Sequence, residues 1–388
     1  MGRTAIVGAE WIDPEAGAAR PGTLLIEGGR LAGFASTDAD LTDWRRVDRT
    51  GAVGAPGFLD LHFHGELVSA GPDDFSAALA RAAREQVESG TTAFLATTVC
   101  WPDADLAPRL DALAQATEAT AEGGAACLGL HLEGPWISAA APGAMDPGGV
   151  RPFDPARDRP LIDGLGERLC MVTFAPELPG ADALLAALMA QGVVPALGHS
   201  AASAEQIEAA ASEGLCHATH LWNAMGPFHH RAPGVAGAVL ADDRIRCDLI
   251  CDGHHVAPAV VRLSAAALGE RLMLISDRVA VPSNGPSALG AAAAEGPDAP
   301  FRRADGTLVG SQLRLDRAVA NLRRFADVGL AEAIAAVTLR PARQLGVEAE
   351  RGTLRPGALA DLALLDAEGA VVETWRSGEP VWSRATDG

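Results

Sequence analysis

The chain has 388 residues, of which 48% are hydrophobic, and a formal net charge of −19. This length and composition suffice for a large core and predict one large domain with a smaller one. The strong negative charge argues against a nucleic acid or an anionic membrane as partner. The N-terminus has neither the basic flank nor the apolar core of a signal peptide, and no apolar run approaches a membrane span, so we expect a cytoplasmic protein.

The cysteine and lysine content excludes several kinds of covalent and metal-binding site. The six cysteines are scattered without a C-x-x-C pair, which predicts reduced thiols rather than a disulfide framework. The chain contains no lysine, which excludes a Schiff base, a P-loop and a carbamylated lysine that bridges two metal ions. A binuclear metal site in this chain would therefore need a different bridging anion.

Both ends of the chain consist of short strand-like pieces separated by turn signals. Residues 1–54 begin with "TAIVGAEWI" and "GTLLIEGGRLAGFA", and residues 351–388 contain "GALADLALLDAEGAVVETWRSGEPVW". We expect the two ends to pair into one small β-sandwich domain. Residues 55–350 are expected to form the second, larger domain.

Within this larger domain, strand-like and helix-like segments alternate. Strands are expected to begin at Phe58, Ala93, Leu128, Met171, Val193, His217, Cys247 and Leu272. Alanine-rich helical text such as "DDFSAALARAAREQVESG" fills most of the gaps. Because parallel strands need such crossovers, the pattern predicts an α/β fold of the (β/α)8 TIM-barrel type. A doubly wound open sheet is the alternative, but the glycine-rich phosphate turn that normally follows its first strand is absent.

The first expected strand ends in "GFLDLHFHGE", where His62 and His64 are one residue apart. Successive side chains on a strand point to opposite faces, so the two imidazoles point the same way, about 7 Å apart along the chain. This spacing suits two nitrogens that converge on one metal ion. Taken alone, a pair of hydrogen-bonded histidines at a strand end is an equally good interpretation.

Other expected strands also end in metal-binding residue types. These are Glu133, His199, His220 and Asp277. The carboxyl ends of the strands form the face where barrel enzymes build their active sites. Each residue has a structural interpretation, such as a helix cap or an arginine partner. Together with the H-x-H pair, however, they predict one site of the kind that Zn²⁺ or Fe²⁺ favours.

Two further histidines lie close to these residues in the sequence. His131 shares the strand face of Glu133, and we interpret it as a residue that orients this glutamate. His217 lies three residues before His220, so on a strand it points to the other face. We interpret His217 as structural.

The chain resembles the amidohydrolase superfamily, and specifically its N-acetylglucosamine-6-phosphate deacetylases. The resemblance is carried by "PGFLDLHFHG", "GLHLEGPWIS", "GHSAAS", "ATHLWNAM", "RAPGVAGAVL", "CDGHHV", "ISD" and "GTLVGSQLRL", and it continues in "AVTLRPARQLGV" and "RGTLRPGALADLALLD". It implies a metal-dependent hydrolase of linear amides that removes acetate from N-acetylglucosamine 6-phosphate and leaves glucosamine 6-phosphate.

The resemblance also implies which residues hold the metal. Glu133, His199 and His220 match the principal ligands of the family. Members that keep the H-x-H pair can hold two ions, so His62 and His64 imply a site for one or two divalent ions, Zn or Fe. With no lysine available, Glu133 is the natural bridge between them.

The acid–base residue and the substrate contacts follow from the same resemblance. Asp277 matches the carboxylate that takes a proton from the attacking water and passes it to the departing amine. The substrate-binding residues implied are Asn223, Ala224, Arg231, His255, Ala144, Met145, Leu308, Val309 and Gly310. In the relatives the matching arginine reaches the sugar phosphate of the neighbouring subunit, which implies a homodimer, and a guanidinium fork suits phosphate oxygens.

Two positions depart from the family pattern. Met145 stands where the family has a histidine near the acetyl group, and a thioether cannot donate a hydrogen bond. Arg278 stands where a small residue usually follows the catalytic aspartate, and it could bind an anion or lower the pKa of that aspartate. His229 and His230 could compensate for the missing histidine. The departures leave open another N-acetylhexosamine phosphate or another acylamino compound as substrate.

Two alternative functions remain at this level. A different hydrolase on the same scaffold, such as an N-acyl-amino-acid deacylase or a cyclic-amide hydrolase, would use the same metal site. A catalytically retired barrel that serves as a binding or scaffolding protein should lose its ligands first, yet every ligand position is filled. Nucleophilic serine catalysis has little support, because there is no G-x-S-x-G motif.

Overall fold

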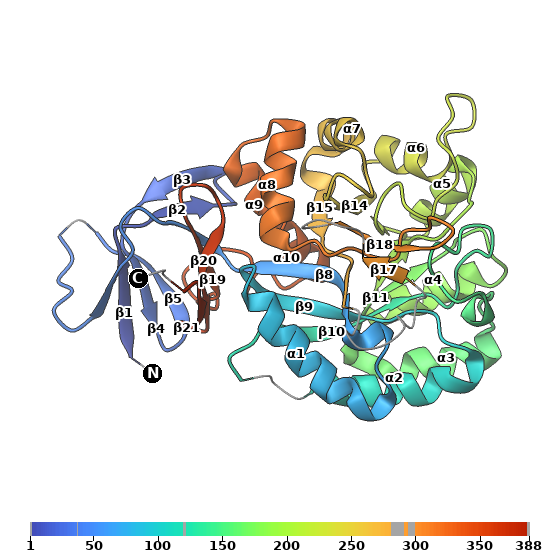
Figure 1. Ribbon diagram of the computed structural model, residues 1–388, viewed down its shortest axis with the longest axis horizontal. Coiled ribbons are helices and arrows are strands. Elements are labelled where there is room, and N and C mark those ends of the chain that lie inside the picture. Colours follow the sequence, from blue (N-terminus) through green and yellow to red (C-terminus); the bar gives the residue numbers. More distant parts are fainter. Residues whose placement is uncertain (1, 37, 119–121, 281–290, 294–298, 386–388) are drawn as a thin grey trace.

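The computed structural model describes residues 2–36, 38–118, 122–280, 291–293 and 299–385. It contains a β-domain with both chain termini, at the left of Figure 1, and a larger α/β domain at the right. Among the described residues, no helix combines the length and the apolarity needed to cross a membrane.

Parallel strands form the wall of a barrel and confirm the (β/α)8 prediction. The strands that the sequence predicts begin within two residues of the expected positions and pair side by side in chain order. They are β8 (Phe58–Gly65), β9 (Thr91–Thr97), β10 (Ala126–Glu133), β11 (Leu169–Phe174), β12 (Val194–Leu197), β13 (His217–Ala218), β14 (Arg246–Ile250) and β15 (Leu272–Ile275).

The sheet closes through a short strand that follows β15. This strand, β16 (Arg278–Val279), pairs in parallel with β8. The backbone N–H of Asp277 also donates to the carbonyl of His62 at 2.9 Å. Closure excludes the doubly wound open sheet, and a small hairpin of β17 (Ala291–Ala293) and β18 (Phe301–Arg303) follows.

Helices connect the strands and lie outside the barrel (Figure 1). They are α1 (Phe75–Val87), α2 (Asp103–Thr117), α3 (Pro155–Leu165), α4 (Ala181–Gln191), α5 (Ala204–Ser212), α6 (Gly234–Ala241), α7 (Pro258–Leu268), α8 (Leu315–Ala326), α9 (Leu330–Ala335) and α10 (Leu339–Leu345). Helix α5 begins with a capping box, in which Ser203 Oγ accepts from the Gln206 N–H and Gln206 Oε1 accepts from the Ser203 N–H.

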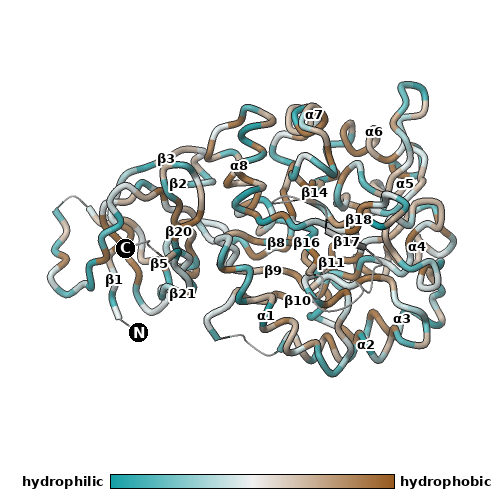
Figure 2. The backbone as a smooth tube through the Cα atoms, in the orientation of Figure 1, coloured by the Kyte–Doolittle hydropathy of each residue, from teal (hydrophilic) through white to brown (hydrophobic). Residues whose placement is uncertain are grey.

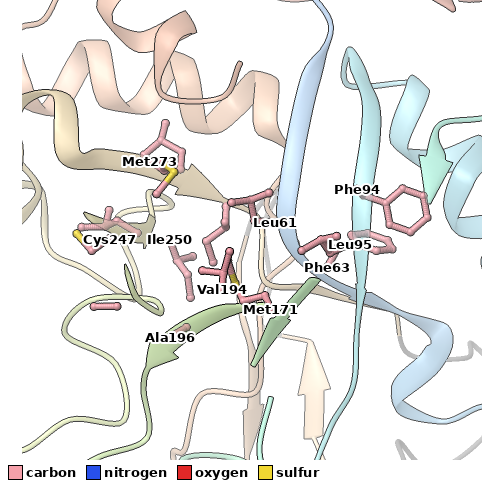
Figure 3. Close-up of a cluster of buried hydrophobic side chains, with 14 of the residues drawn as sticks. Leu61, Phe63, Phe94, Leu95, Met171, Val194, Ala196, Cys247, Ile250 and Met273 are labelled. Atoms are coloured by element: carbon pink, nitrogen blue, oxygen red, sulfur yellow. The ribbon is translucent and has the colours of Figure 1, made fainter. Parts of the chain in front are cut away.

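Apolar side chains fill the space between the strands and the helices. In Figure 2 the barrel strands are largely brown, whereas teal segments concentrate on the outer turns and helices. Figure 3 shows a cluster of buried hydrophobic side chains from the barrel strands, including Leu61 of β8, Met171 of β11 and Met273 of β15. The rings of Phe63 and Phe94 pack edge to face with their centroids 5.6 Å apart. This packing holds the strand ends that carry the polar residues.

The β-domain is a sandwich that both ends of the chain build together, as the sequence predicts. One sheet has the order β5-β4-β1-β6 and the other the order β21-β20-β19-β7-β2-β3. Its strands are β1 (Arg3–Val7), β2 (Glu10–Asp13), β3 (Ala18–Pro21), β4 (Leu24–Glu27), β5 (Arg30–Phe34), β6 (Arg45–Asp48), β7 (Val53–Pro56), β19 (Leu362–Leu365), β20 (Val371–Arg376) and β21 (Glu379–Ser383). Trp11 and Trp375, from opposite ends of the chain, share its core. The domain boundaries at residues 54/55 and 350/351 stay a prediction.

A buried carboxylate anchors the loop that follows Glu133 at the end of β10. Asp158 on α3 is fully buried and accepts hydrogen bonds from Trp136 Nε1 at 2.9 Å and from Arg151 Nη1 at 2.6 Å. Arg157 donates a further bond at 3.0 Å. Burial raises the pKa of Asp158, but these hydrogen bonds outweigh burial and hold the pKa below its ordinary value.

An Asp158→Asn substitution is expected to destabilise the protein by about 3 kcal/mol, because it removes the fully buried charged partner of Arg151 and leaves this largely buried guanidinium only the half-exposed Asp103. The shift of the urea-unfolding midpoint measures this loss. Since the folded pKa is lowered, the ionic contribution is present above about pH 4 and disappears as the pH falls through the folded pKa. The difference between variant and wild type should therefore shrink below about pH 4.

Asp163→Asn on the same helix is the matched control. Asp163 pairs with Arg159 at 2.7 Å, but both side chains are about half exposed. An exposed pair of this kind contributes at most about 0.5 kcal/mol. Equal destabilisation by the two substitutions would contradict the structural role of Asp158.

Candidate metal centre and active site

The predicted metal-binding side chains all lie at the carboxyl ends of barrel strands. They are His62 and His64 on β8, Glu133 at the end of β10, His199 after β12, His220 after β13 and Asp277 after β15. All of them are buried. Residues from distant parts of the chain therefore meet at one end of the barrel.

Glu133 lies at the centre of this cluster. Its Oε1 is 3.0 Å from His199 Nε2 and 2.8 Å from His220 Nε2. Its Oε2 is 3.4 Å from His62 Nε2 and 3.3 Å from His64 Nε2. Each carboxylate oxygen thus faces one pair of imidazoles, which is the arrangement of a carboxylate that bridges two sites.

Asp277 completes the group around the H-x-H pair. Its Oδ1 lies 3.3 Å from His62 Nε2 and 3.2 Å from His64 Nε2. Ligand atoms of one tetrahedral Zn²⁺ ion are about 3.4 Å apart when the bonds are about 2.1 Å long. The separations in both groups are close to this value, so each group has the dimensions to hold one ion.

Backbone carbonyls set the orientation of two of the imidazoles. His199 Nδ1 donates to the carbonyl of Ala141 at 3.1 Å, and His64 Nδ1 donates to the carbonyl of Thr97 at 3.1 Å. A carbonyl oxygen only accepts, so in the neutral imidazole Nε2 carries the lone pair. Metal-binding histidines are typically oriented by a second hydrogen bond of this kind.

The nitrogen atoms that face the centre lie close to one another. His199 Nε2 is 3.2 Å from His220 Nε2, and His62 Nε2 is 3.1 Å from His64 Nε2. Lone pairs that face each other repel unless a cation lies between them. The nitrogen and oxygen donors fit Zn²⁺ or Fe²⁺ in both groups.

The pKa values of two histidines point to a site for positive charge. Burial lowers the pKa of His64, but hydrogen bonds and charges from Asp277 and Glu133 outweigh burial and raise the pKa to about 10. Burial likewise lowers the pKa of His220, yet Glu133 raises it to about 9. The carboxylates thus stabilise a cation at these imidazoles, either a proton or a metal ion.

The two carboxylates are ionised in this surrounding. Burial raises the pKa of Glu133, but the charge of His62 and the hydrogen bonds from His199 and His220 lower it well below its ordinary value. Burial also raises the pKa of Asp277, while the histidines of β8 outweigh burial and lower it. At neutral pH both groups are therefore available as ligands or bases.

Several of these residues have a left-handed backbone. The φ angle is 48° for His199, 34° for His220 and 47° for Asp277. This region is unfavourable for residues with a side chain and recurs at functional sites, where the surrounding structure holds the strain. The turn points each side chain into the centre directly after its strand ends.

Gly310 lies directly against the backbone of Asp277. The N–H of Ser311 donates to the Asp277 carbonyl at 2.8 Å. Gly310 has a φ of 55°, and a Cβ atom there would lie 2.9 Å from the same carbonyl oxygen. Only glycine permits this close approach.

A cavity of about 290 Å³ opens above the cluster. Most of the predicted substrate-binding residues line it. They are Asn223, Ala224, His255, Ala144, Met145, Leu308, Val309 and Gly310. His64, Glu133, His199, His220 and Asp277 line the same cavity. The predicted metal ligands and substrate contacts therefore belong to one pocket.

Residues 54–381 match the amidohydrolase family over most of the chain. The chain belongs to this family. The resemblance inferred from the sequence motifs is thus confirmed.

The amidohydrolase is similar to several deacetylases. It is 35% identical over 335 residues to the N-acetylgalactosamine-6-phosphate deacetylase of Escherichia coli O157:H7, which covers 86% of this chain and 89% of the relative. It is 35% identical over 382 residues to the human N-acetylglucosamine-6-phosphate deacetylase, covering 92% and 91% of the two chains. A mutant N-acetyl-D-glucosamine-6-phosphate deacetylase from Mycobacterium smegmatis, solved in complex with N-acetyl-D-glucosamine 6-phosphate, superposes with a TM-score of 0.87 at 32% identity, covering 99% of this chain and 100% of that one.

Arg231 lies apart from the pocket of this amidohydrolase. It is exposed on the loop between β13 and α6, and its Nη1 lies 2.7 Å from His230 Nε2. The rings of His229 and His230 pack with their centroids 4.3 Å apart. Within one subunit, neither Arg231 nor this histidine pair contributes to the pocket lining.

The sequence suggested that Arg278 lies beside Asp277, where it could bind an anion or lower the pKa of that aspartate. The structure places its side chain elsewhere. Its side chain leaves the barrel and approaches Glu85 on α1, with Nη2 3.9 Å from the carboxylate. It does not line the cavity around Asp277. Because strand β16 alternates its side chains, Val279 faces the cavity and Arg278 points away from it.

The hydrogen bonds of His131 differ from the expectation. They go to the carbonyl of Leu61 at 3.1 Å and to Thr173 Oγ1 at 2.8 Å, not to Glu133. Its ring packs edge to face on His62, with the centroids 4.8 Å apart. His131 therefore supports His62 rather than orienting the glutamate.

Sequence reasoning missed two aspartates that hold other site residues. Asp248 accepts from His217 Nε2 at 2.8 Å and also from the backbone N–H of His220, which gives His217 the structural position expected for it. Asp252 Oδ2 accepts from His255 Nδ1 at 2.6 Å. The sequence did contain a pattern that could have indicated them, because "CDLICDGHH" places both acids in or beside an otherwise apolar strand.

Proposed function

We propose that the protein is a metal-dependent deacetylase that hydrolyses N-acetylglucosamine 6-phosphate to glucosamine 6-phosphate and acetate. One observation carries the proposal: Glu133 lies between two pairs of imidazoles at the floor of a cavity that also contains Asp277. The relatives named above act on amino-sugar phosphates and support this class of substrate.

A divalent ion held by Glu133, His199 and His220, with a second one at His62 and His64, would activate water near neutral pH and polarise the amide carbonyl. The buried ligands hold this centre away from bulk solvent. The cavity walls orient the sugar, because Asn223 and the backbone at Ala224 offer polar groups beside the histidines.

Asp277 would perform the proton transfers. Its carboxylate is ionised at neutral pH and lies at the cavity floor, so it can accept a proton from the attacking water. The same group then returns the proton to the nitrogen as the carbon–nitrogen bond breaks. An amine is a poor leaving group without this proton, so base and acid roles fall to one residue.

A second candidate substrate is N-acetylgalactosamine 6-phosphate, which the Escherichia coli relative's name specifies. The two sugars differ only in the configuration at one hydroxyl. Acetate release from both phosphates, from the unphosphorylated sugars and from N-acetyl amino acids tests the proposal. Release from N-acetyl amino acids alone would contradict it, and release from none of them would favour a retired barrel.

The identity and number of metal ions are part of the proposal. The nitrogen-rich donor set favours Zn or Fe, and the two groups around Glu133 allow one or two ions. Elemental analysis of protein reconstituted with each metal gives the stoichiometry. The cytoplasm as the compartment of the enzyme stays a prediction from the sequence.

We also propose that the enzyme is a homodimer in which Arg231 reaches the phosphate in the neighbouring subunit. Arg231 is exposed and lies outside the pocket of its own subunit, whereas an anionic substrate of an acidic protein needs a local cation. Arg231 belongs to the segment between β13 and α6, after the strand has ended.

An Arg231→Ala substitution is expected to raise KM for the 6-phosphate about 10- to 100-fold, because one charge-assisted pair is lost. Turnover of unphosphorylated N-acetylglucosamine should stay unchanged. Steady-state kinetics with both substrates measures the effect. Arg159→Ala, at an exposed ion pair on α3, is the control.

Subunit mixing separates a contact in trans from one in cis. Arg231→Ala subunits lack the phosphate contact, and Asp277→Asn subunits lack the base. Random reassociation should restore about one quarter of wild-type activity, because half of the dimers are mixed and each mixed dimer has one complete site. No recovery from a reassociated dimer would place Arg231 outside the neighbouring site.

A further inference from the structure

The cavity above the metal centre has a polar side and an apolar side. Asn223 and Ala224 follow β13, and His255 follows β14. On the other side, Val68 follows β8 and Val99 follows β9. Strands β9 and β13 are four positions apart in the closed sheet, so the two sides face each other across the barrel mouth.

The apolar side is built from buried side chains of several loops. Met145 is 8% exposed, Val279 4% and Val309 1%. Val279 and Val309 pack with Val68 and with Phe301 of β18 in one hydrophobic cluster. Apolar groups in this wall lie beside His64 and Asp277, where the carbonyl carbon of a bound amide has to be attacked.

This wall is also thin. A second cavity of about 500 Å³ lies behind it. Val68, Val99, Ala144 and Met145 line both cavities and form the partition between them. Two aliphatic side chains, one methyl group and one flexible thioether therefore separate the reaction centre from additional space.

The loop with Met145 is fixed against the metal centre. Gly143 has a φ of 55°, and a Cβ atom there would lie 3.0 Å from His199 Cε1. The thioether sulfur of Met145 accepts the N–H of Cys100 at 3.4 Å. Methionine has an unbranched, flexible side chain that adapts to the shape of a neighbouring group.

We propose that this apolar wall is an acyl subsite that takes acyl groups longer than acetyl, so that the enzyme also hydrolyses N-propionyl- and N-butyrylglucosamine 6-phosphate. The inference rests on the proposed function. Polar groups hold the sugar on one side, which directs the acyl chain to the opposite side, toward Val68, Val99 and Met145. Water adds to the acyl carbon, the carbon–nitrogen bond breaks, and the products are the longer carboxylate and the protonated amino sugar.

The kinetic signature follows from burial of the additional methylene groups. Each methylene that enters an apolar subsite raises kcat/KM by up to about fourfold. A subsite closed around acetyl would instead reject propionyl, because close-packed walls tolerate added volume poorly.

The experiment compares N-acetyl-, N-propionyl- and N-butyrylglucosamine 6-phosphate with metal-reconstituted wild-type enzyme. We expect kcat/KM for the propionyl substrate to be at least equal to the acetyl value. A lower value with normal acetyl turnover overturns the subsite and leaves the deacetylase proposal intact. Loss of turnover on all three substrates would instead refute the deacetylase function and, with it, the subsite.

Met145→Ala tests the partition directly. Removal of the thioether should raise the ratio of butyryl to acetyl kcat/KM at least threefold, because the chain can then enter the second cavity. This ratio does not depend on the fraction of folded enzyme. Met189→Ala, at a 48% exposed site on α4, is the matched control and should leave the ratio unchanged. An unchanged ratio in Met145→Ala overturns the assignment of this residue.

Discussion

A Glu133→Gln variant is expected to lose its bound metal and to hydrolyse N-acetylglucosamine 6-phosphate at least about 1,000-fold more slowly than the wild type. Both carboxylate oxygens of Glu133 face imidazole nitrogens, at 2.8–3.0 Å on one side and 3.3–3.4 Å on the other. An amide keeps the shape but has one oxygen and no charge. It cannot bridge two ions or balance the charge of one.

Metal content by elemental analysis and acetate release are the two measurements for this variant. Glu208→Gln on the exposed face of α5 is the matched control and should change neither of them. Circular dichroism separates a loss of metal from a loss of fold. A Glu133→Gln enzyme that keeps stoichiometric metal would show that this carboxylate is not a ligand.

An Asp277→Asn variant is expected to keep the metal ion at Glu133, His199 and His220 while kcat falls about 10²- to 10⁴-fold. The asparagine fills the same space but cannot take a proton from water or return it to the amine. Because the folded pKa of Asp277 is lowered, the wild-type base stays ionised well into the acidic range. The variant should therefore show the reduced kcat across the whole neutral range rather than a shifted pH optimum.

Single-turnover rates and metal analysis test this variant together. Asp182→Asn at an exposed site on α4 is the control. Near-normal kcat in Asp277→Asn would refute the acid–base role. Loss of one of two bound ions would identify Asp277 as a ligand of the group that contains His62 and His64.

The residue pattern alone predicts the barrel and the location of its reactive end. Strand and helix periodicity are local properties, so the strand starts near Phe58 and Leu272 can be predicted without knowledge of the packing. Glu133 and His199 also follow directly from their places at strand ends. Parallel strands in a closed barrel bring these ends together, whatever the details of the side chains.

Only the tertiary structure determines which side-chain atoms lie close together at the metal centre. The positive φ of His220 and Asp277 turns each side chain into the centre after its strand has ended, and no periodicity predicts such a turn. The direction of the Arg278 side chain could not be predicted from the sequence either. Adjacent residues on a strand point to opposite sides, so its guanidinium lies near Glu85 instead of in the cavity.

Contacts between residues far apart in the chain also position the site residues that the sequence analysis did not predict. Asp248 fixes the backbone of His220 only because β13 and β14 lie side by side. Val68 and Val99 become one apolar wall only because the loops after β8 and β9 converge. The sequence by itself determined the strand order and the chemistry at the strand ends, whereas packing between distant segments decided the geometry, because side-chain direction depends on contacts that are not local in the chain.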